Sequence, residues 1–208
     1  MKKLILTAAL TASSFAFAGT PWKIDTAHAG ANFAVKHLAV STVKGTLGAV
    51  TGTVDLDDND VTKSKVTVSI DVKGLNTMVQ KRDDHLRSKD FLEADTYPAI
   101  TFTSTKIEKG EGNKVKVTGD LKIKTTTKSV VIDGELTPEV KNPFSSIPTR
   151  GFSGSTSINR KDFGLTWNVA LETGGVLVGD DVKITVEAEL NKDVPAPAPA
   201  KGAPPAKK

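Results

Sequence analysis

The chain has 208 residues and no cysteine, so it has no disulfide, no thiol nucleophile and no thiolate metal ligand. Its 28 basic and 24 acidic side chains are unevenly placed, because residues 1–18 and 191–208 hold six of the basic residues and one of the acidic ones. The remaining 22 basic and 23 acidic residues leave no excess positive charge for nucleic-acid binding.

Residues 1–18 have the composition of an export signal. Lys2 and Lys3 precede an apolar stretch at residues 4–17, and Ala16 and Ala18 supply the small residues of a cleavage site. The stretch is shorter than the roughly 20 apolar residues that a membrane helix needs. We therefore expect export with cleavage of the signal after Ala18, and an uncleaved anchor is the alternative.

Most of the chain alternates apolar and polar residues with a period of two. This pattern is typical of antiparallel strands with one dry face and one wet face, rather than of a buried parallel sheet. The alternating segments are residues 66–72, 100–102, 115–124, 130–136, 152–158 and 182–190. Turn-forming residues lie between them, at 57–60, 109–113, 138 and 141–143.

Residues 43–56 follow the alternation less regularly. Their apolar residues change parity between Leu47 and Val50, and Gly45, Gly48 and Gly52 lie close to the change. Glycines at a parity change predict a β-bulge or a sharp bend. Barrels use such bends to close.

One segment is predicted to be helical. Thr77 and Gln80 have the spacing of a capping box, and Pro98 disfavours helix at Tyr97. The helical stripe that follows consists of Met78, Val79, Arg82, Leu86 and Lys89. About eight strands and one short helix predict an all-β barrel in which the helix forms a plug or lid.

Four lysines share the wet face of one predicted strand region: Lys114, Lys116, Lys122 and Lys124. They are expected to keep the surface soluble and to protect it from edge pairing. Transient contact with an anionic membrane surface is the alternative.

Residues 191–208 are rich in proline, alanine and lysine. Such a segment has little apolar surface to bury and favours extended conformations, so we expect a disordered tail. Residues 19–190 are then a single domain, which is long enough to form one hydrophobic core.

Signals for catalysis and for metal binding are weak. His28 and His37 are an odd number of residues apart, so on one regular strand they face opposite sides. Residues 55–66 resemble a calcium loop but have Asp60 where glycine is needed and Val66 where glutamate is needed. We predict no catalytic residue, no metal and no cofactor.

Several motifs, in their order along the chain, resemble the YceI-like family over residues 21–190. They are Trp22-Lys-Ile-Asp25 with His28, Phe33-Ala-Val-Lys-His37, Arg82-Asp-Asp-His-Leu-Arg-Ser88 with Asp90-Phe91, Tyr97-Pro98, Thr101-Phe-Thr-Ser104, Gly119-Asp-Leu-Lys-Ile123, Asn159-Arg-Lys-Asp-Phe-Gly164 and Val178-Gly-Asp-Asp-Val182. The chain departs from the family at Ala29, at Leu92 and at the turn after Ile123, where Lys124 and Thr125 replace a His-Gly pair.

The resemblance implies an extended, lipocalin-like antiparallel barrel of eight strands with a long pocket. It also implies a periplasmic protein that binds and transports a polyisoprenoid, such as a quinone or polyprenyl chain, or a related lipid. A homodimer is a further expected assembly. Two alternatives are a structural or interaction module with a filled barrel and a lipid-modifying enzyme that uses Asp83 or His85.

Candidate ligand-binding residues fall into three groups. The expected wall consists of Phe33, Val35, Leu47, Phe102, Phe152, Phe163 and Trp167, and the expected lid of Met78, Val79, Leu86 and Phe91. A polar head group would meet Arg82, His85 or Arg160, and His85 could make that contact depend on pH. Ordinary core packing is the alternative for the apolar residues, and a pin that holds the helix is the alternative for Arg82 and Asp83.

Overall fold

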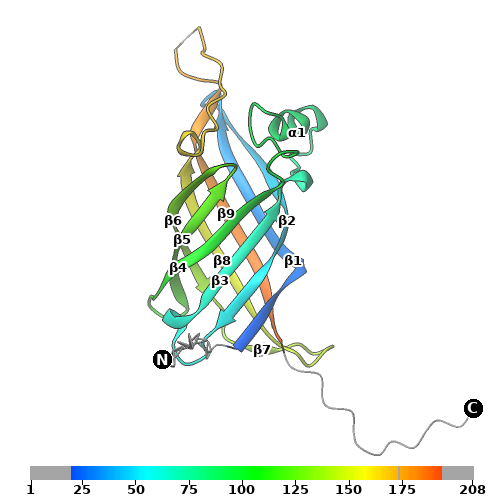
Figure 1. Ribbon diagram of the computed structural model, residues 1–208, viewed down its shortest axis with the longest axis vertical. Helices are drawn as coiled ribbons and strands as arrows, with labels where there is room; N and C mark the ends of the chain where they lie inside the picture. The colour runs from blue at the N-terminus through cyan, green and yellow to red at the C-terminus, as the bar shows by residue number, and fades with distance from the viewer. Residues whose placement is uncertain (1–19, 173, 194–208) are drawn as a thin grey trace, which may run out of the picture.

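The computed structural model describes residues 20–172 and 174–193 (Figure 1). The predicted export signal, its cleavage after Ala18 and the tail from residue 194 onward lie outside the described residues. Within the described part, no helix is both long enough and apolar enough to cross a membrane.

The described strands form one antiparallel sheet that closes on itself. Its order is β6-β5-β4-β3-β2-β1-β9-β8-β7, and β6 also pairs with β8, so eight strands make a barrel and β7 is a short addition beside β8. This confirms the predicted eight-stranded, lipocalin-like barrel. The strands are β1 (Thr20–His37), β2 (Ser41–Leu56), β3 (Lys65–Asp71), β4 (Ala99–Lys109), β5 (Lys114–Ile123), β6 (Thr126–Leu136), β7 (Val140–Lys141), β8 (Pro148–Asn159) and β9 (Val178–Lys192).

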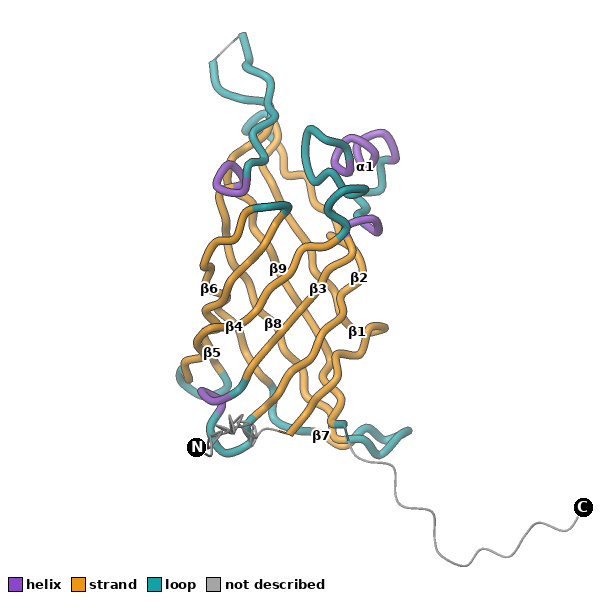
Figure 2. The backbone as a smooth tube through the Cα atoms, in the orientation of Figure 1, coloured by secondary structure: helices purple, strands orange, loops and turns teal. Residues whose placement is uncertain are grey.

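The helical segments lie at the two ends of the barrel (Figures 1 and 2). At the upper end in Figure 1 are η2 (Val72–Gly74), α1 (Gln80–Arg87) and η3 (Arg160–Phe163), together with the β1–β2 turn and the described residues of the loop 164–177, which are 164–172 and 174–177. The lower end has η1 (Val61–Lys63) and the turns that join β4 to β5 and β6 to β8. We call these the upper end and the lower end.

The predicted capping box at Thr77 is wrong. Helix α1 begins at Gln80, and its N-cap residue is Val79, which makes no side-chain capping bond. Thr77 has another partner, because its backbone N–H and its hydroxyl both donate to the buried carboxylate of Asp83, at 2.8 and 2.5 Å. The Thr77 hydroxyl is therefore not available as a helix cap. Helix α1 spans Gln80–Arg87, whereas the predicted helical stripe runs from Met78 to Lys89.

The glycine-rich part of β2 contains the predicted bulge. Ala31 pairs with Gly48 but the next residue, Asn32, pairs with Thr46, so Leu47 is the extra residue. Gly48 has φ 128°, and a Cβ atom there would lie 1.9 Å from the carbonyl oxygen of Asp71. Only glycine fits this crossing of β2 and β3.

A second irregularity was not predicted. Residues 25–28 of β1 pair with neither β2 nor β9, and they project outward from the barrel (Figure 2). Asp25 stabilises the projection by accepting a hydrogen bond from the backbone N–H of Ala27 at 3.0 Å. No glycine or proline marks this segment, so the alternation pattern does not reveal it.

We expect Gly48→Ala to lower the free energy of unfolding by about 3 kcal/mol, because it combines a left-handed backbone with a collision. Gly112→Ala is the matched control: Gly112 has φ 61° but no atom within 4 Å of an added Cβ. The control should lose only about 1 kcal/mol, the cost of the backbone conformation. Urea unfolding of both variants measures the difference, and equal losses would contradict the collision.

Candidate ligand cavity

The inward faces of the barrel strands enclose an elongated cavity of about 240 Å³. Its accessible wall consists of apolar atoms. Leu86, Phe91 and Leu165 border it at the upper end, and Leu56 and Leu190 border it at the lower end. Many inward-facing side chains in its middle are only half-buried, among them Val68, Val130, Ile132, Val182 and Ile184. These side chains therefore form a wall and do not fill the interior.

Glycines in the wall make room for aromatic rings. A Cβ atom on Gly119 would lie 2.4 Å from Cζ of Phe102, and one on Gly134 would lie 2.7 Å from Cζ of Phe152. The Phe152 ring also covers Gly154. Each ring therefore lies against a glycine backbone instead of pointing across the barrel, and the centre of the barrel stays open.

At the lower end, Trp22, which is 1% exposed, belongs to one buried cluster with Leu56 and Leu190 of the cavity wall. Arg150 and Lys192 lie over its ring, with the Arg150 Cζ 5.7 Å and the Lys192 Nζ 5.3 Å from the ring centroid. Asp58 pairs with both cations, at 3.6 Å and 3.0 Å. Its hydrogen bond raises the pKa of Lys192, so the cation is stabilised in its charged form.

The upper end is covered by an apolar lid. Leu86 of α1 and the buried Phe91 and Leu92 after it face the cavity. Three rings join this lid to the loop 164–177: the centroid of His85 lies 5.1 Å from that of Phe91 and 4.7 Å from that of Trp167. His85 Nε2 also lies 2.8 Å from the Asp90 carboxylate.

Polar contacts hold the lid to the segment that precedes it. Arg82 donates from Nε to the hydroxyl of Thr77 at 2.7 Å and from Nη2 to the carbonyl oxygen of Thr77 at 2.9 Å. Arg87 donates from Nη1 to the carbonyl oxygen of Leu75 at 2.7 Å. With Asp83, which accepts two bonds from Thr77, these side chains pin α1 to residues 75–77.

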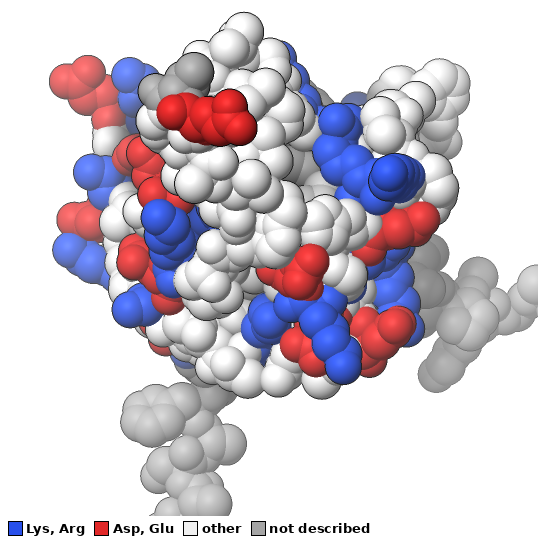
Figure 3. Space-filling model, turned by 90° about the horizontal axis from the view of Figure 1, so that it is seen from above, with Lys and Arg blue, Asp and Glu red and all other residues white. Residues whose placement is uncertain are grey.

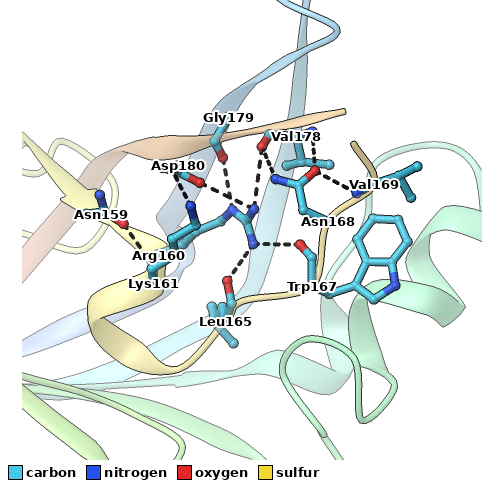
Figure 4. A network of polar contacts seen from close by, with 10 residues as sticks. All are labelled: Asn159, Arg160, Lys161, Leu165, Trp167, Asn168, Val169, Val178, Gly179 and Asp180. Carbon is cyan, nitrogen blue, oxygen red and sulfur yellow. Dashed lines mark hydrogen bonds and ion pairs between the residues drawn. The ribbon is translucent and has the colours of Figure 1, made fainter. Parts of the chain in front are cut away.

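Arg160 organises the opposite side of the upper end (Figure 4). Arg160 is 3% exposed. Its guanidinium donates hydrogen bonds to the carbonyl oxygens of Leu165, of Trp167 at 2.9 Å and of Gly179 at 2.9 Å. Burial lowers the pKa of Arg160, and Asp180, 3.5 Å away, opposes that effect. Its donors are thus engaged in holding the loop 164–177 against β9.

The structure places the candidate residues in two groups. Those that line the cavity are Phe33, Val35, Leu47, Leu86, Phe91, Phe102, Phe152 and Arg160. Those away from its wall are Met78, Val79, Arg82, His85, Phe163 and Trp167. Met78 is 90% exposed and Val79 is 45% exposed, so neither reaches the interior.

Sequence reasoning missed much of the wall. Leu92, Ile107, Val117 and Leu121 line the cavity, as do Val130 and Ile184. Val117, Leu121, Val130 and Ile184 belong to strands that alternate clearly, so the inward parity of each strand would have identified them. Ile107 would have been missed, because an irregularity between Ser104 and Lys106 changes the parity of β4 before it. Aromatic residues received more weight than parity in the candidate set.

Among the described residues, one group has the types and spacing of metal ligands. Asp25, His28 and Glu189 bring their ligand atoms within 4.8 Å of one another on the outer surface of the barrel. His28 Nδ1 lies 3.0 Å from Asp25 and 3.6 Å from Glu189. The hydrogen bond to Asp25 and the charge of Glu189 raise the pKa of His28, and the same hydrogen bond lowers the pKa of Asp25.

Comparisons with known proteins agree with this geometry. The sequence profile described as the YceI-like domain matches residues 22–190. A UPF0312 protein of Staphylococcus epidermidis is 38% identical over 174 residues, which are 84% of this chain and 99% of that protein.

Solved structures share the fold. The YceI protein of Campylobacter jejuni is 31% identical, with 93% of this chain and 100% of that chain covered and a TM-score of 0.64. A domain of Saccharophagus degradans described as polyisoprenoid-binding has a TM-score of 0.60 and covers 82% of this chain and 98% of its own, at 14% identity. At that identity the likeness concerns the fold alone.

We expect the contribution of His28 to stability to depend on pH. A raised pKa means that this contribution is complete below the ordinary histidine value of 6.5 and is lost as the pH rises through the folded-state pKa. The contribution of Asp25 is present above its ordinary value of 3.8 and is lost as the pH falls through its lowered pKa.

The difference in urea midpoint between the wild type and His28→Gln should therefore be largest near about pH 5 and should shrink toward about pH 9. His37→Gln, a histidine substitution at the end of the same strand, serves as the control. A difference for His28→Gln that grows with pH would contradict this interpretation.

Arg160→Met should lower the free energy of unfolding by about 3 kcal/mol, because it leaves several carbonyl oxygens without their donor. Lys161→Met is the matched control, since the exposed Lys161 pairs only with Asp180 among the described side chains. The control should change stability by no more than about 0.5 kcal/mol in urea unfolding. Similar losses for both variants would argue against a role for the buried network.

Proposed function

Because the chain belongs to the YceI-like domain family, we propose that its cavity binds a long apolar molecule of the polyisoprenoid class, a quinone, polyprenyl chain or related lipid. In this proposal the protein acts as a periplasmic carrier. The observation that carries the proposal is the elongated cavity, whose accessible wall is apolar from Leu86 and Phe91 at the lid to Leu56 and Leu190 at the lower end.

The chemistry of the wall selects the kind of ligand. A polar molecule would leave its hydrogen-bonding groups without partners there, which costs several kcal/mol. A hydrocarbon chain loses nothing of this kind and gains from leaving water. The proposal accordingly assigns binding, and no reaction, to the cavity.

The shape of the cavity favours a chain over a compact molecule. Leu47 and Leu56 both line the cavity, and Leu56 follows Leu47 by nine positions along β2. At about 3.3 Å per residue, they lie about 30 Å apart along the strand, or about 22 Å along the axis of a barrel with ordinary strand tilt. An extended isoprenoid segment fits such a space lengthwise.

The energy of binding is compatible with a carrier. Burying about 400 Å² of apolar chain yields about 10 kcal/mol before costs. Association and ordering cost at least about 4 kcal/mol. The remaining 6 kcal/mol or so corresponds to tens of micromolar, which permits exchange with another apolar phase.

The ligand class and the location rest on different support. The Saccharophagus degradans domain, which shares the fold, is described as polyisoprenoid-binding. The charged, apolar and small residues of the first 18 positions support export to the periplasm. Because Arg82, His85 and Arg160 are each engaged by protein partners, the proposed head group lies outside the apolar wall.

Mass spectrometry of an organic extract of the gently purified protein tests the ligand class. A polyisoprenoid or similar long apolar molecule should be recovered from the native protein. The same extract of protein that was unfolded and washed before refolding should lack it. Recovery of no apolar compound, with no binding of an added polyprenyl chain, would refute the proposal.

A matched pair on β6 tests the cavity itself. Val130 faces the cavity and its neighbour Val131 is 40% exposed on the outside. Val130→Trp should weaken binding of a fluorescent polyprenyl analogue by about tenfold or more, because the larger ring takes the space of the chain. Val131→Trp should leave the titration unchanged, and equal losses would argue against the cavity as the binding site.

A further inference from the structure

Exposed apolar side chains gather at the upper end of the barrel. Nine large hydrophobic residues are exposed in the part of the chain that the structure describes. Six of them belong to segments at the upper end, namely Leu38, Val40, Met78, Val79, Val169 and Val176. Val40 and Met78 are 83% and 90% exposed, so they contribute little to the core. We call these six residues the apolar rim.

The backbone at the rim is arranged to present these side chains. Leu38, Ala39 and Met78 have φ angles of 55°, 57° and 65°, in the left-handed region that favours glycine or asparagine. Asn76 holds the turn by accepting a hydrogen bond from the backbone N–H of Met78 at 2.6 Å. Leu38 and Met78 thus have strained backbone conformations and exposed side chains. Packing of the core does not require this arrangement.

Unpaired cations flank the rim. Lys36 and Lys44 lie on either side of the β1–β2 turn, and Lys73 and Lys81 lie on either side of Met78 and Val79. No carboxylate occurs in residues 36–44 or 73–82. None of these four lysines forms an ion pair with a described residue.

The carboxylates of the lid are largely engaged. Asp84 pairs with Arg87 at 2.9 Å, Asp90 with His85 at 2.8 Å and Glu93 with Lys124 at 3.5 Å. The loop 164–177 adds one acidic residue, Glu172. Seen from above, a band of uncharged residues crosses this face, and basic and acidic residues lie together on both sides of it (Figure 3).

We infer that the upper end docks on the surface of a lipid bilayer that contains anionic head groups, and that the apolar ligand passes between that bilayer and the cavity. The inference rests on the proposed carrier function. Exposed aliphatic side chains, with unpaired lysines beside residues 38–40 and 78–79, match the apolar and charged layers of a bilayer surface. A protein partner fits less well, because lysine is depleted at protein–protein interfaces.

The position of the rim connects docking to the cavity. Met78 and Val79 directly precede α1, and Leu86 of α1 borders the cavity. Leu38 donates its backbone N–H to the carbonyl oxygen of Leu177 at 2.8 Å, which joins the turn to the loop that also carries Trp167. The rim therefore lies on the segments that cover the cavity, and none of its six residues lies at the lower end.

Vesicle flotation of the purified full protein tests the inference. Vesicles of phosphatidylethanolamine with phosphatidylglycerol should carry the wild type, and vesicles of phosphatidylcholine alone should carry it about tenfold less. The double variant Val40→Asp/Met78→Asp should lose about tenfold or more of its binding to the anionic vesicles.

The matched control is Val140→Asp/Phe144→Asp, which changes two residues of the lower end that are 60% and 98% exposed. It should bind the anionic vesicles as the wild type does. The inference is overturned if the wild type does not float with anionic vesicles, or if the control loses as much as the rim variant. It is also overturned if the rim is instead covered by a second copy, seen as a dimer in sedimentation that the rim variant abolishes.

A solution titration with the polyprenyl analogue separates this inference from the carrier proposal. The rim variant should bind the analogue as the wild type does, while its transfer of analogue from donor to acceptor vesicles should slow about tenfold or more. Unchanged transfer in the rim variant would overturn docking and leave the carrier function standing. Failure of the wild type itself to bind the analogue would refute the carrier function, whatever the flotation result.

Discussion

Backbone hydrogen bonding around the closed sheet allows this protein to keep an unfilled interior. Each of the eight barrel strands pairs with a neighbour on both sides, so most of the wall satisfies its backbone donors and acceptors without help from the centre. The closing pair is the shortest, because β6 and β8 pair only between residues 133–136 and 152–155. An empty cavity of 240 Å³ still costs about 6 kcal/mol at roughly 24 cal/mol per Å³. This cost is comparable with the whole free energy of unfolding of a typical domain. An apolar ligand in the cavity would therefore stabilise the folded protein, because it would supply the apolar contacts that the wall side chains lack.

The open centre depends on where glycine and phenylalanine fall on neighbouring strands. Phe102 lies against Gly119, and Phe152 lies against Gly134 and Gly154. These pairs bring together residues from different strands, so each ring depends on the strand register. The same sheet would close around a filled core if larger residues stood at the glycine positions and turned the rings inward.

The two ends of the barrel are closed by different physical means. At the lower end, Trp22 is covered by Arg150 and Lys192, and Asp58 fixes both cations. At the upper end, apolar side chains cover the cavity, while Arg160 and the pins of α1 hold the surrounding backbone through carbonyl groups. The charged closure has no exposed aliphatic side chain of the apolar rim beside it, whereas the apolar closure lies next to that rim. This asymmetry is the reason that ligand exchange is assigned to the upper end.

Alternation in the sequence alone determined most of the antiparallel strands and, with the glycines, the bulge beside Gly48, because a period of two and a glycine's backbone freedom are local properties. The resemblance to the YceI-like family added the closed barrel. The tertiary structure decided the rest: Asp83 engaged Thr77 and removed the predicted cap, Met78 turned outward, and the segment at residues 25–28 left both neighbouring strands. It also decided that the interior stays open, since this depends on contacts between residues far apart in the chain, which local patterns do not encode.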